Sequence, residues 1–437
     1  MSTAGPAIAI FFALTGTLMA TSVFNVGNSG IAFFYLVFLL PLIRLVFPGR
    51  SFIRNKPDPR SRAMTIVIGI TITALLATTV LQMIILTLRD SGSEVIHLVS
   101  RLSFLLYFLI AQRYLQAEML TETFLWLRRF LIAVCAYGVY QLPAKLLGLP
   151  LFLDWLRNNR SFDTYSYDTA GWIGLVRATS IYAEPSQATI PILVLFILNL
   201  NIKSSAFSKV VGWVALILFT IMTFSRTAWL AVVVETLSWL LFRSQKFSRI
   251  VLIRRAPVLT ATLLLFLISP IWGFIEAGDN VDLSAQERSG GIVLGMQMIK
   301  DAPLLGLGWN SFGDAAVRYS TVAPSVSSSV DFGFIHNMLV SYVQQAGLSG
   351  LFLAALPFIL LVCWSTAPSW ITYATVASFL VTAELGDIGY SSLTWLWLAL
   401  LINSGFVEQH AQPNWGEVIS WRPAYKGRMS ESPHSAS

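Results

Sequence analysis

Long apolar runs recur along most of the chain and are separated by short polar stretches. An apolar helix of about 17–25 residues crosses the hydrocarbon core of a bilayer, so each run of that length predicts a membrane span. We count about twelve such runs. They lie near residues 6–24, 30–48, 63–87, 95–112, 129–147, 187–202, 209–224, 227–242, 256–275, 347–365, 371–388 and 392–406. The pattern predicts an all-α polytopic membrane protein.

The composition agrees with this prediction. Hydrophobic residues make up 55% of the 437 residues and charged residues only 12%, whereas charged residues make up about a quarter of a typical soluble protein. The first apolar run lacks a basic segment before it and a convincing cleavage site after it, so we interpret it as a retained helix and not as a signal peptide.

The basic residues predict the orientation, because Lys and Arg accumulate in cytoplasmic loops. A cytoplasmic N-terminus puts most of the 29 Lys and Arg residues on the inner side, including the short loops RSFIRNKPDPRSR and RSQKFSRIVLIRR. Both termini are then cytoplasmic, and residues 407–437, which are rich in Ser and Pro, form a tail that we expect to be disordered. The net charge of +7 reflects this topology and not nucleic-acid binding.

The outward face carries two long segments in this topology. We expect residues 1–406 to form one transmembrane domain with periplasmic segments 149–186 and 276–335, the second being a large loop before the tenth helix. This asymmetry argues against a transporter built from two similar halves and favours chemistry on the outer face. Cys135 and Cys363 both fall in spans, so the sequence indicates neither a disulfide framework nor a metal site, and no cofactor is expected.

An arginine stands inside the apolar stretch FTIMTFSRTAWLAVVVETL, where mid-bilayer placement would be costly. One span ends near residue 224 and the next begins near residue 227, so Ser225 and Arg226 are expected in a tight outer turn. Arg226 then precedes a helix N-terminus, where unpaired backbone N–H groups favour an anion. The alternative is an arginine that reaches toward lipid headgroups.

The first outer segment ends in RATSIYAEPSQA, in which Pro185 and Ser186 predict a helix start. Arg177 and Glu184 lie just before that start. Such a pair can hold a phosphate and orient an acceptor hydroxyl, or it can be a structural ion pair. Both readings stay open on the sequence.

The second outer segment adds a third arginine and a histidine. Arg288 precedes Gly290 and Gly291, after which Ile292 to Lys300 predict a short amphipathic helix. The Gly306 to Gly308 turn is expected to approach another part of the backbone. His336 begins a further helix that Gly347 interrupts before the next span, and it is the histidine best placed for acid–base work on the outer face.

Three stretches in this order resemble one family. SRTAWLA at the start of an inward span, KDAPLLGLGWNSF in the large loop and HNMLVSYVQQAGLSGLF before the next span resemble the superfamily of O-antigen ligases and O-antigen polymerases. RATSIYAEPSQA resembles the corresponding element of polysaccharide polymerases. The likeness covers about residues 175–360, while the earlier spans agree only in topology. The paired arginine and glycine repeats of some polymerases are not located, so the subfamily stays open.

The resemblance implies a metal-independent, inverting glycosyltransferase that takes a glycan from a polyprenyl diphosphate at the periplasmic face of the inner membrane. It implies that Arg226, Arg288 and Arg177 bind the diphosphate, with His336 as the base and Glu184 in reserve. No paired outer carboxylates stand at metal-ligand spacing, consistent with arginines in place of a divalent ion. The implied partners are the lipid-linked donor, a glycan acceptor, membrane lipids and, for a polymerase, a flippase and a chain-length regulator; nucleic acid is not among them.

Three functions remain open on the sequence. A polymerase joins lipid-linked repeats, a ligase passes the chain to lipid A core, and RATSIYAEPSQA favours the polymerase. A transporter or flippase of an anionic lipid-linked substrate is the alternative from another class, and it predicts charges along a path through the bundle. Arg101 is expected to reach an interface or an acidic partner, and Glu235 has no explanation from the sequence.

Overall fold

The computed structural model describes most of the chain between residues 4 and 403. The described ranges are 4–19, 21–26, 29–41, 59–85, 91–115, 117–158, 169–170, 175–182, 184–242, 283–309, 311–319, 337–367, 369–385 and 391–403, together with Ile335 and Gly389. The predicted span at 256–275 and the predicted tail at 407–437 lie outside them.

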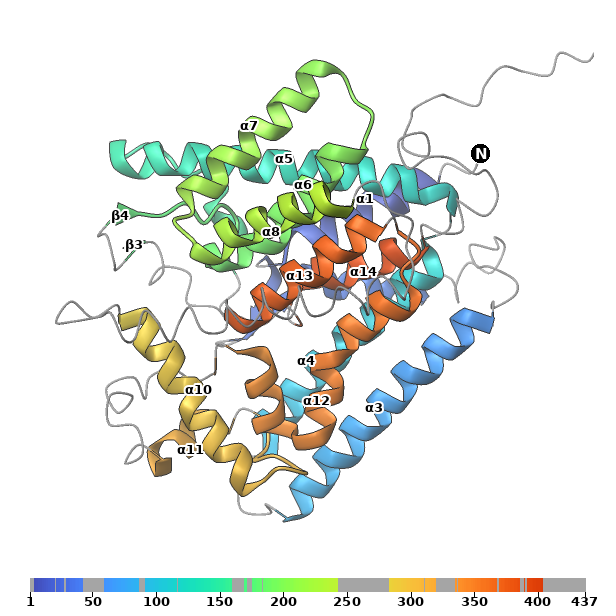
Figure 1. The fold of residues 1–437 in the computed structure, drawn as a ribbon, viewed down its shortest axis with the longest axis vertical. Helices are drawn as coiled ribbons and strands as arrows, with labels where there is room; N and C mark the ends of the chain where they lie inside the picture. Colours follow the sequence, from blue (N-terminus) through green and yellow to red (C-terminus); the bar gives the residue numbers. More distant parts are fainter. Residues whose placement is uncertain are drawn as a thin grey trace, which may run out of the picture.

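Helices account for most of the described residues, and the long ones lie side by side (Figure 1). The α-helices are α1 (Ala4–Thr17), α3 (Pro59–Ile85), α4 (Ser91–Tyr114), α5 (Ala117–Leu147), α6 (Thr189–Asn201), α7 (Ala206–Met222), α8 (Arg226–Phe242), α10 (Leu283–Asp301), α11 (Phe312–Tyr319), α12 (Met338–Trp364), α13 (Ser369–Leu385) and α14 (Ser392–Asn403). The 3₁₀ helices are η1 (Phe33–Phe38), η2 (Asp154–Leu156) and η3 (Pro185–Ala188).

Four of the described helices are long and apolar enough to cross a membrane, at residues 62–84, 95–114, 119–147 and 338–364. Shorter apolar helices lie at 5–17, 185–201, 206–222, 370–383 and 392–403. The prediction of an all-α membrane protein agrees with these helices. The number of spans and their orientation stay predictions.

The N-terminal region differs from the predicted pair of long helices. Helix α1 ends at Thr17, and an antiparallel hairpin of β1 (Ser22–Val26) and β2 (Ser29–Ala32) follows it. The predictions of helical spans at residues 6–24 and 30–48 are therefore wrong where this hairpin lies. Asn25 and Gly30, which pair across it, are weak helix formers, and Asn158 anchors β1 by accepting from the Ser22 N–H at 2.7 Å.

The two ends of the described chain lie at the same end of the helix bundle. Gly5 in the first turn of α1 lies beside Met119 in the first turn of α5. At the end of α14, the Asn403 side chain donates to the Leu115 carbonyl at 3.0 Å. At the opposite end, Ser392 donates to the Thr15 carbonyl at 2.9 Å, so α14 runs antiparallel to α1.

Helix α12 is sharply kinked at Gly347, which has φ 55° and ψ −131° inside the helix. The residues before and after the kink fold back toward each other, as Figure 1 shows. A Cβ on Gly350 would clash with the Tyr342 carbonyl, although eight residues of straight helix would separate the two by about 12 Å. The predicted interruption at Gly347 is confirmed, although the helix begins at Met338 and not at His336.

The Gly306 to Gly308 turn docks against this kink, which confirms that it approaches another part of the backbone. The kink leaves helix carbonyls without partners inside the helix. The Leu307 N–H donates to the Gln344 carbonyl at 2.8 Å, and the Gly308 N–H donates to the Gln345 carbonyl at 3.0 Å. In return, the Leu348 N–H donates to the Leu304 carbonyl at 3.0 Å. We call these three hydrogen bonds the glycine interlock.

Helix α3 supports the interlock from outside. The Gln82 side-chain amide donates to the Leu305 carbonyl and, at 2.8 Å, to the Gln345 carbonyl. The Trp309 indole N–H donates to the Thr79 hydroxyl at 2.9 Å. The loop, α12 and α3 are thereby joined through buried polar groups.

The second outer segment contains a longer helix than predicted. Helix α10 begins at Leu283, not at Ile292, and therefore includes both Gly290 and Gly291. Both glycines are buried. Arg288 consequently lies within the helix backbone instead of preceding the helix.

We predict that Gly347→Ala lowers the apparent melting temperature of the purified protein strongly. An alanine there would adopt a backbone conformation that costs about 1–3 kcal/mol, and its Cβ would clash with the Leu304 carbonyl. The matched control is Gly69→Ala in α3, where nothing lies within 4 Å of the added methyl group; it should be neutral or stabilising by up to about 1 kcal/mol. Equal melting temperatures for the two variants would contradict the interlock.

Candidate functional site

The turn between α7 and α8 positions Arg226. Thr223 and Phe224 end α7, and Phe224 has a φ of 45°, which is unusual for a residue with a side chain. The Ser225 hydroxyl then accepts from the Ala228 N–H at 3.4 Å as the N-cap of α8. Arg226 is the first residue of α8 and is exposed, so its predicted position at a helix start is confirmed.

The Arg177 segment pairs with the end of α7. The last carbonyls of a helix have no partner within the helix, and here the segment before η3 supplies two donors. The Ala178 N–H donates to the Met222 carbonyl at 3.0 Å, and the Arg177 Nε donates to the Thr223 carbonyl at 3.1 Å. Arg177 is therefore bonded to a carbonyl only three residues before Arg226.

Gln141 of α5 fixes the residues that follow Arg177. Its buried side-chain oxygen accepts from the backbone N–H groups of Thr179 and Ser180, both at 2.8 Å. Its amide group donates to the Asp154 carboxylate at 3.2 Å. One glutamine thus satisfies two buried backbone donors of RATSIYAEPSQA, although nothing in the residues around it singles it out.

Glu184 lies where the sequence predicts, directly before the helix start. Pro185 begins η3, and α6 follows it. The Glu184 carboxylate accepts from the Ser186 hydroxyl at 2.8 Å, and the side chain is half-buried. Since η3 packs against α8, Glu184, Arg177 and Arg226 all lie at the same end of this group of helices.

Lys145 adds a cation that sequence reasoning missed. It stands in the last turn of α5, and its ammonium donates to the Arg177 carbonyl at 3.3 Å. A lysine in the last turn of an outward-running span was the signal that could have identified it. The described part of this end therefore carries three basic residues, Lys145, Arg177 and Arg226.

The structure describes neither the Arg288 side chain nor His336, so their positions are inferred from neighbouring residues. The backbone of Arg288 lies in α10, and His336 is outside the described residues. Ile335 is buried against Gly295 of α10, and Asn337 caps α12 by accepting from the Val340 N–H at 2.9 Å. Helix α10 and the start of α12 are therefore in contact, while their approach to Arg226 stays a prediction.

Arg101 of α4 is a further buried cation close to this part of α12. Its guanidinium donates to the Tyr342 hydroxyl and lies 4.2 Å from the centre of the Tyr342 ring. Only 4% of the residue is exposed, so the expectation that it reaches an interface is wrong. The buried position holds the charge against the short first part of α12, which begins at Met338.

Glu235, which had no explanation from the sequence, has a polar neighbour on another helix. It is fully buried in α8, and the Ser378 hydroxyl of α13 donates to it at 3.2 Å. Nine residues of α8, or about 14 Å, separate it from Arg226. Glu235 therefore belongs to the α8–α13 contact and not to the cluster at the start of α8.

The cluster at the start of α8 combines groups that can bind an anion and orient a hydroxyl. Arginine and lysine donate charge-assisted hydrogen bonds to phosphate oxygens, and the first N–H groups of a helix add to them. Burial raises the pKa of Tyr182 well above its usual value, so this phenol stays neutral and is no base. No group of three or more potential metal ligands occurs among the residues that the structure describes.

Comparison with known proteins finds a family model that matches part of the chain. Residues 211–355, about a third of the chain, match the family model described as O-antigen ligase. The matched segment runs from α7 to α12 and includes Arg226, Arg288, His336 and both sides of the glycine interlock. The search of curated proteins finds no match. Residues 211–355 are therefore similar to the O-antigen ligase family.

We predict that Gln141→Leu destabilises the protein by about 3 kcal/mol, because two buried backbone N–H groups lose their acceptor. The apparent melting temperature should fall, and proteolysis should become faster near residues 177–182. Gln297→Leu is the control, since Gln297 lies on α10 and contacts only Lys300 through its described side-chain hydrogen bond. A stable, protease-resistant Gln141→Leu variant would show that the segment is held by other contacts.

Proposed function

We propose that this protein polymerises lipid-linked oligosaccharide repeat units on the periplasmic face of the inner membrane. The single observation that carries the proposal is the placement of Arg226 within the family-matched segment. It begins α8 beside a turn whose carbonyl holds Arg177. A third cation, Lys145, bonds to the backbone of Arg177 at the same end of the helices. Glycan transfer of the ligase or polymerase type is the activity of the family.

The donor in this proposal is a glycan on a polyprenyl diphosphate, and the leaving diphosphate is the group that the basic residues bind. Negative charge grows on it as the glycosidic bond breaks. Arg226 and Arg177 are assigned to its oxygens together with the first N–H groups of α8, because preorganised donors stabilise charge that develops in the transition state. Arg288 is assigned to the same diphosphate from α10.

The reaction is a single displacement with inversion. The acceptor hydroxyl oxygen forms a bond to the anomeric carbon while the bond from that carbon to the diphosphate oxygen breaks. The bonding pair leaves with the polyprenyl diphosphate, and the hydroxyl proton passes to a base. His336 is assigned as that base and Glu184 as the reserve, since a base near neutral pKa suits this step.

The acceptor distinguishes two members of the family. A polymerase uses another lipid-linked glycan, and the resemblance of RATSIYAEPSQA to polymerase elements favours it. A ligase uses lipid A core, and the description of the matched family model favours that acceptor. For a polymerase, a flippase that delivers the repeats and a chain-length regulator are the proposed partners.

We predict that a strain lacking this protein makes single repeats in place of long glycan chains, and that the wild-type gene restores the long chains. Arg226→Ala should restore them poorly, because loss of one such donor slows transfer about 100-fold or more. His336→Ala should also fail. Glycan size on gels and amounts of each variant in membranes are the measurements.

Arg113→Ala is the matched control, because Arg113 is an exposed basic residue in the last turn of α4, on the face predicted to be cytoplasmic. It should restore normal chains. Long chains that accumulate on the polyprenyl carrier would instead identify a ligase. Unchanged glycans in the deletion strain would favour the transporter.

A further inference from the structure

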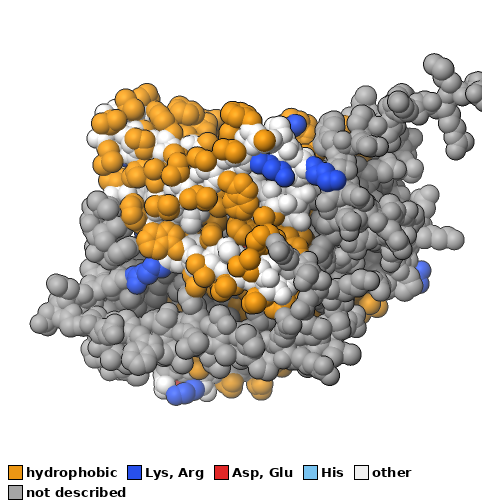
Figure 2. All heavy atoms as spheres, turned by 45° about the horizontal axis from the view of Figure 1, so that its top comes forward, with side chains coloured by type: hydrophobic (Ala, Val, Ile, Leu, Met, Phe, Trp, Pro, Cys, Tyr) orange, Lys and Arg blue, Asp and Glu red, His pale blue; other side chains and the backbone are white. Residues whose placement is uncertain are grey.

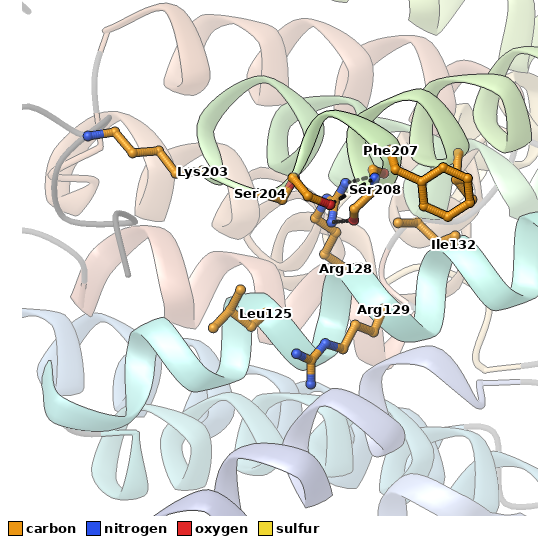
Figure 3. A pocket seen from close by; sticks show the side chains of 10 residues that line it. Leu125, Arg128, Arg129, Ile132, Lys203, Ser204, Phe207 and Ser208 are labelled. Carbon is orange, nitrogen blue, oxygen red and sulfur yellow. Dashed lines mark hydrogen bonds between the residues drawn. The ribbon is translucent and has the colours of Figure 1, made fainter. Parts of the chain in front are cut away.

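A groove of about 740 Å³ lies between α5 and the connection from α6 to α7. Figure 3 shows α5 crossing below this connection, with Arg128 pointing up to it. Its lining is basic, hydroxylic and apolar: Leu125, Arg128, Arg129, Ile132, Lys203, Ser204, Ser205, Phe207, Ser208 and Val211. The groove contains none of the residues assigned to glycan transfer.

Arg128 forms the rigid part of the groove. Only 4% of the residue is exposed. Its Nε donates to the Asn199 side chain, and its two terminal nitrogens donate to the Ser208 hydroxyl and carbonyl, all at 2.9 Å. These bonds use three of the five N–H groups of a guanidinium. The arginine therefore keeps a fixed orientation and retains hydrogen-bonding capacity.

Two exposed cations border the groove. Arg129 lies 4.6 Å from the centre of the Trp126 ring, and Lys203 is at the end of α6. Both side chains point away from Arg128 in Figure 3. The three cations therefore lie around the groove and do not converge on one atom. The described lining contains no carboxylate, and the local charge favours an anion with several oxygens.

The groove continues into an apolar face. Figure 2 shows a continuous area of hydrophobic side chains in its upper left part, with Lys and Arg side chains beside it. On α7, this face includes Phe207, Val210, Val214, Ile217 and Ile221, which are 49–79% exposed. They extend over about 21 Å of helix, which exceeds the roughly 15 Å depth of the hydrocarbon region of one leaflet.

The groove is remote from the candidate site. Arg128 and Lys145 stand 17 residues apart on α5, which corresponds to about 26 Å along the helix. That distance is close to the thickness of the hydrocarbon core, about 30 Å. The groove consequently lies at the opposite membrane face, which the charge distribution predicts to be cytoplasmic.

We propose that this groove binds the headgroup of an anionic phospholipid of the leaflet opposite the candidate site, with its acyl chains along the exposed face of α7. The phosphate lies near Arg128 and the Ser204 to Ser208 turn, while Arg129 and Lys203 attract it from the rim. Basic pockets between membrane helices on the cytoplasmic side bind anionic headgroups for this electrostatic reason. A free phosphate lacks the apolar part that the α7 face accommodates.

The test compares lipid binding by the full chain, purified in detergent and stripped of lipid, using native mass spectrometry. Phosphatidylglycerol should bind more tightly than phosphatidylcholine, and a large excess of inorganic phosphate should not displace it. Arg129→Gln with Lys203→Gln should weaken phosphatidylglycerol binding about 25-fold, since each basic residue near a lipid surface contributes about 5-fold.

The matched control is Arg113→Gln with Lys300→Gln, which removes two exposed basic side chains outside the groove. It should bind phosphatidylglycerol as the wild type does. An equal loss in both double variants, no preference over phosphatidylcholine, or displacement by inorganic phosphate would overturn the proposal. Glycan synthesis is not the readout, so failure here leaves the proposed transferase activity intact.

Discussion

The glycine interlock is the constraint on which the outer half of the family-matched segment depends. A kinked helix in a membrane protein exposes backbone groups that lipid cannot satisfy, so another part of the protein must bond to them. Here the loop of residues 304–308 bonds to α12 on both sides of Gly347. The positive φ angles of Gly306 and Gly347 make this approach accessible without strain. The kink and the loop therefore stabilise each other.

Backbone carbonyls that need hydrogen-bond donors also determine how the Arg177 segment packs against the end of α7. The end of α7 leaves carbonyls without partners, and the segment at residues 177–178 supplies their donors. Gln141 then satisfies the next two backbone N–H groups. Basic side chains gather at this end because backbone hydrogen bonding brings their segments together. Hydrogen bonds to backbone carbonyls, from the Arg177 guanidinium to Thr223 and from the Lys145 ammonium to Arg177, offset part of the repulsion between these like charges.

The apolar pattern predicts helices well but not their interruptions. The starts of α8 and η3 follow from Ser225 and Pro185, because capping and proline act through local chemistry. The hairpin at β1 and β2 depends on Asn158, which is more than 130 residues away, so local pattern could not predict it. Gln141 escaped notice for the same reason, whereas Lys145 had a local signal in its place in the last turn of α5. Their roles arise from a segment at residues 177–180 that packs against α5 only in the folded protein.

Helix α5 makes polar contacts with other segments at both of its ends. One end binds the Arg177 segment through Gln141 and Lys145, and the other fixes the α6–α7 connection through Arg128. Helix α7 joins the same two places, since Ser208 bonds to Arg128 and its last carbonyls bond to residues 177 and 178. Two contacts of this kind, one at each end, therefore hold the same pair of helices together. The position of Arg226 at the start of α8 therefore depends on contacts at both ends of α5 and α7.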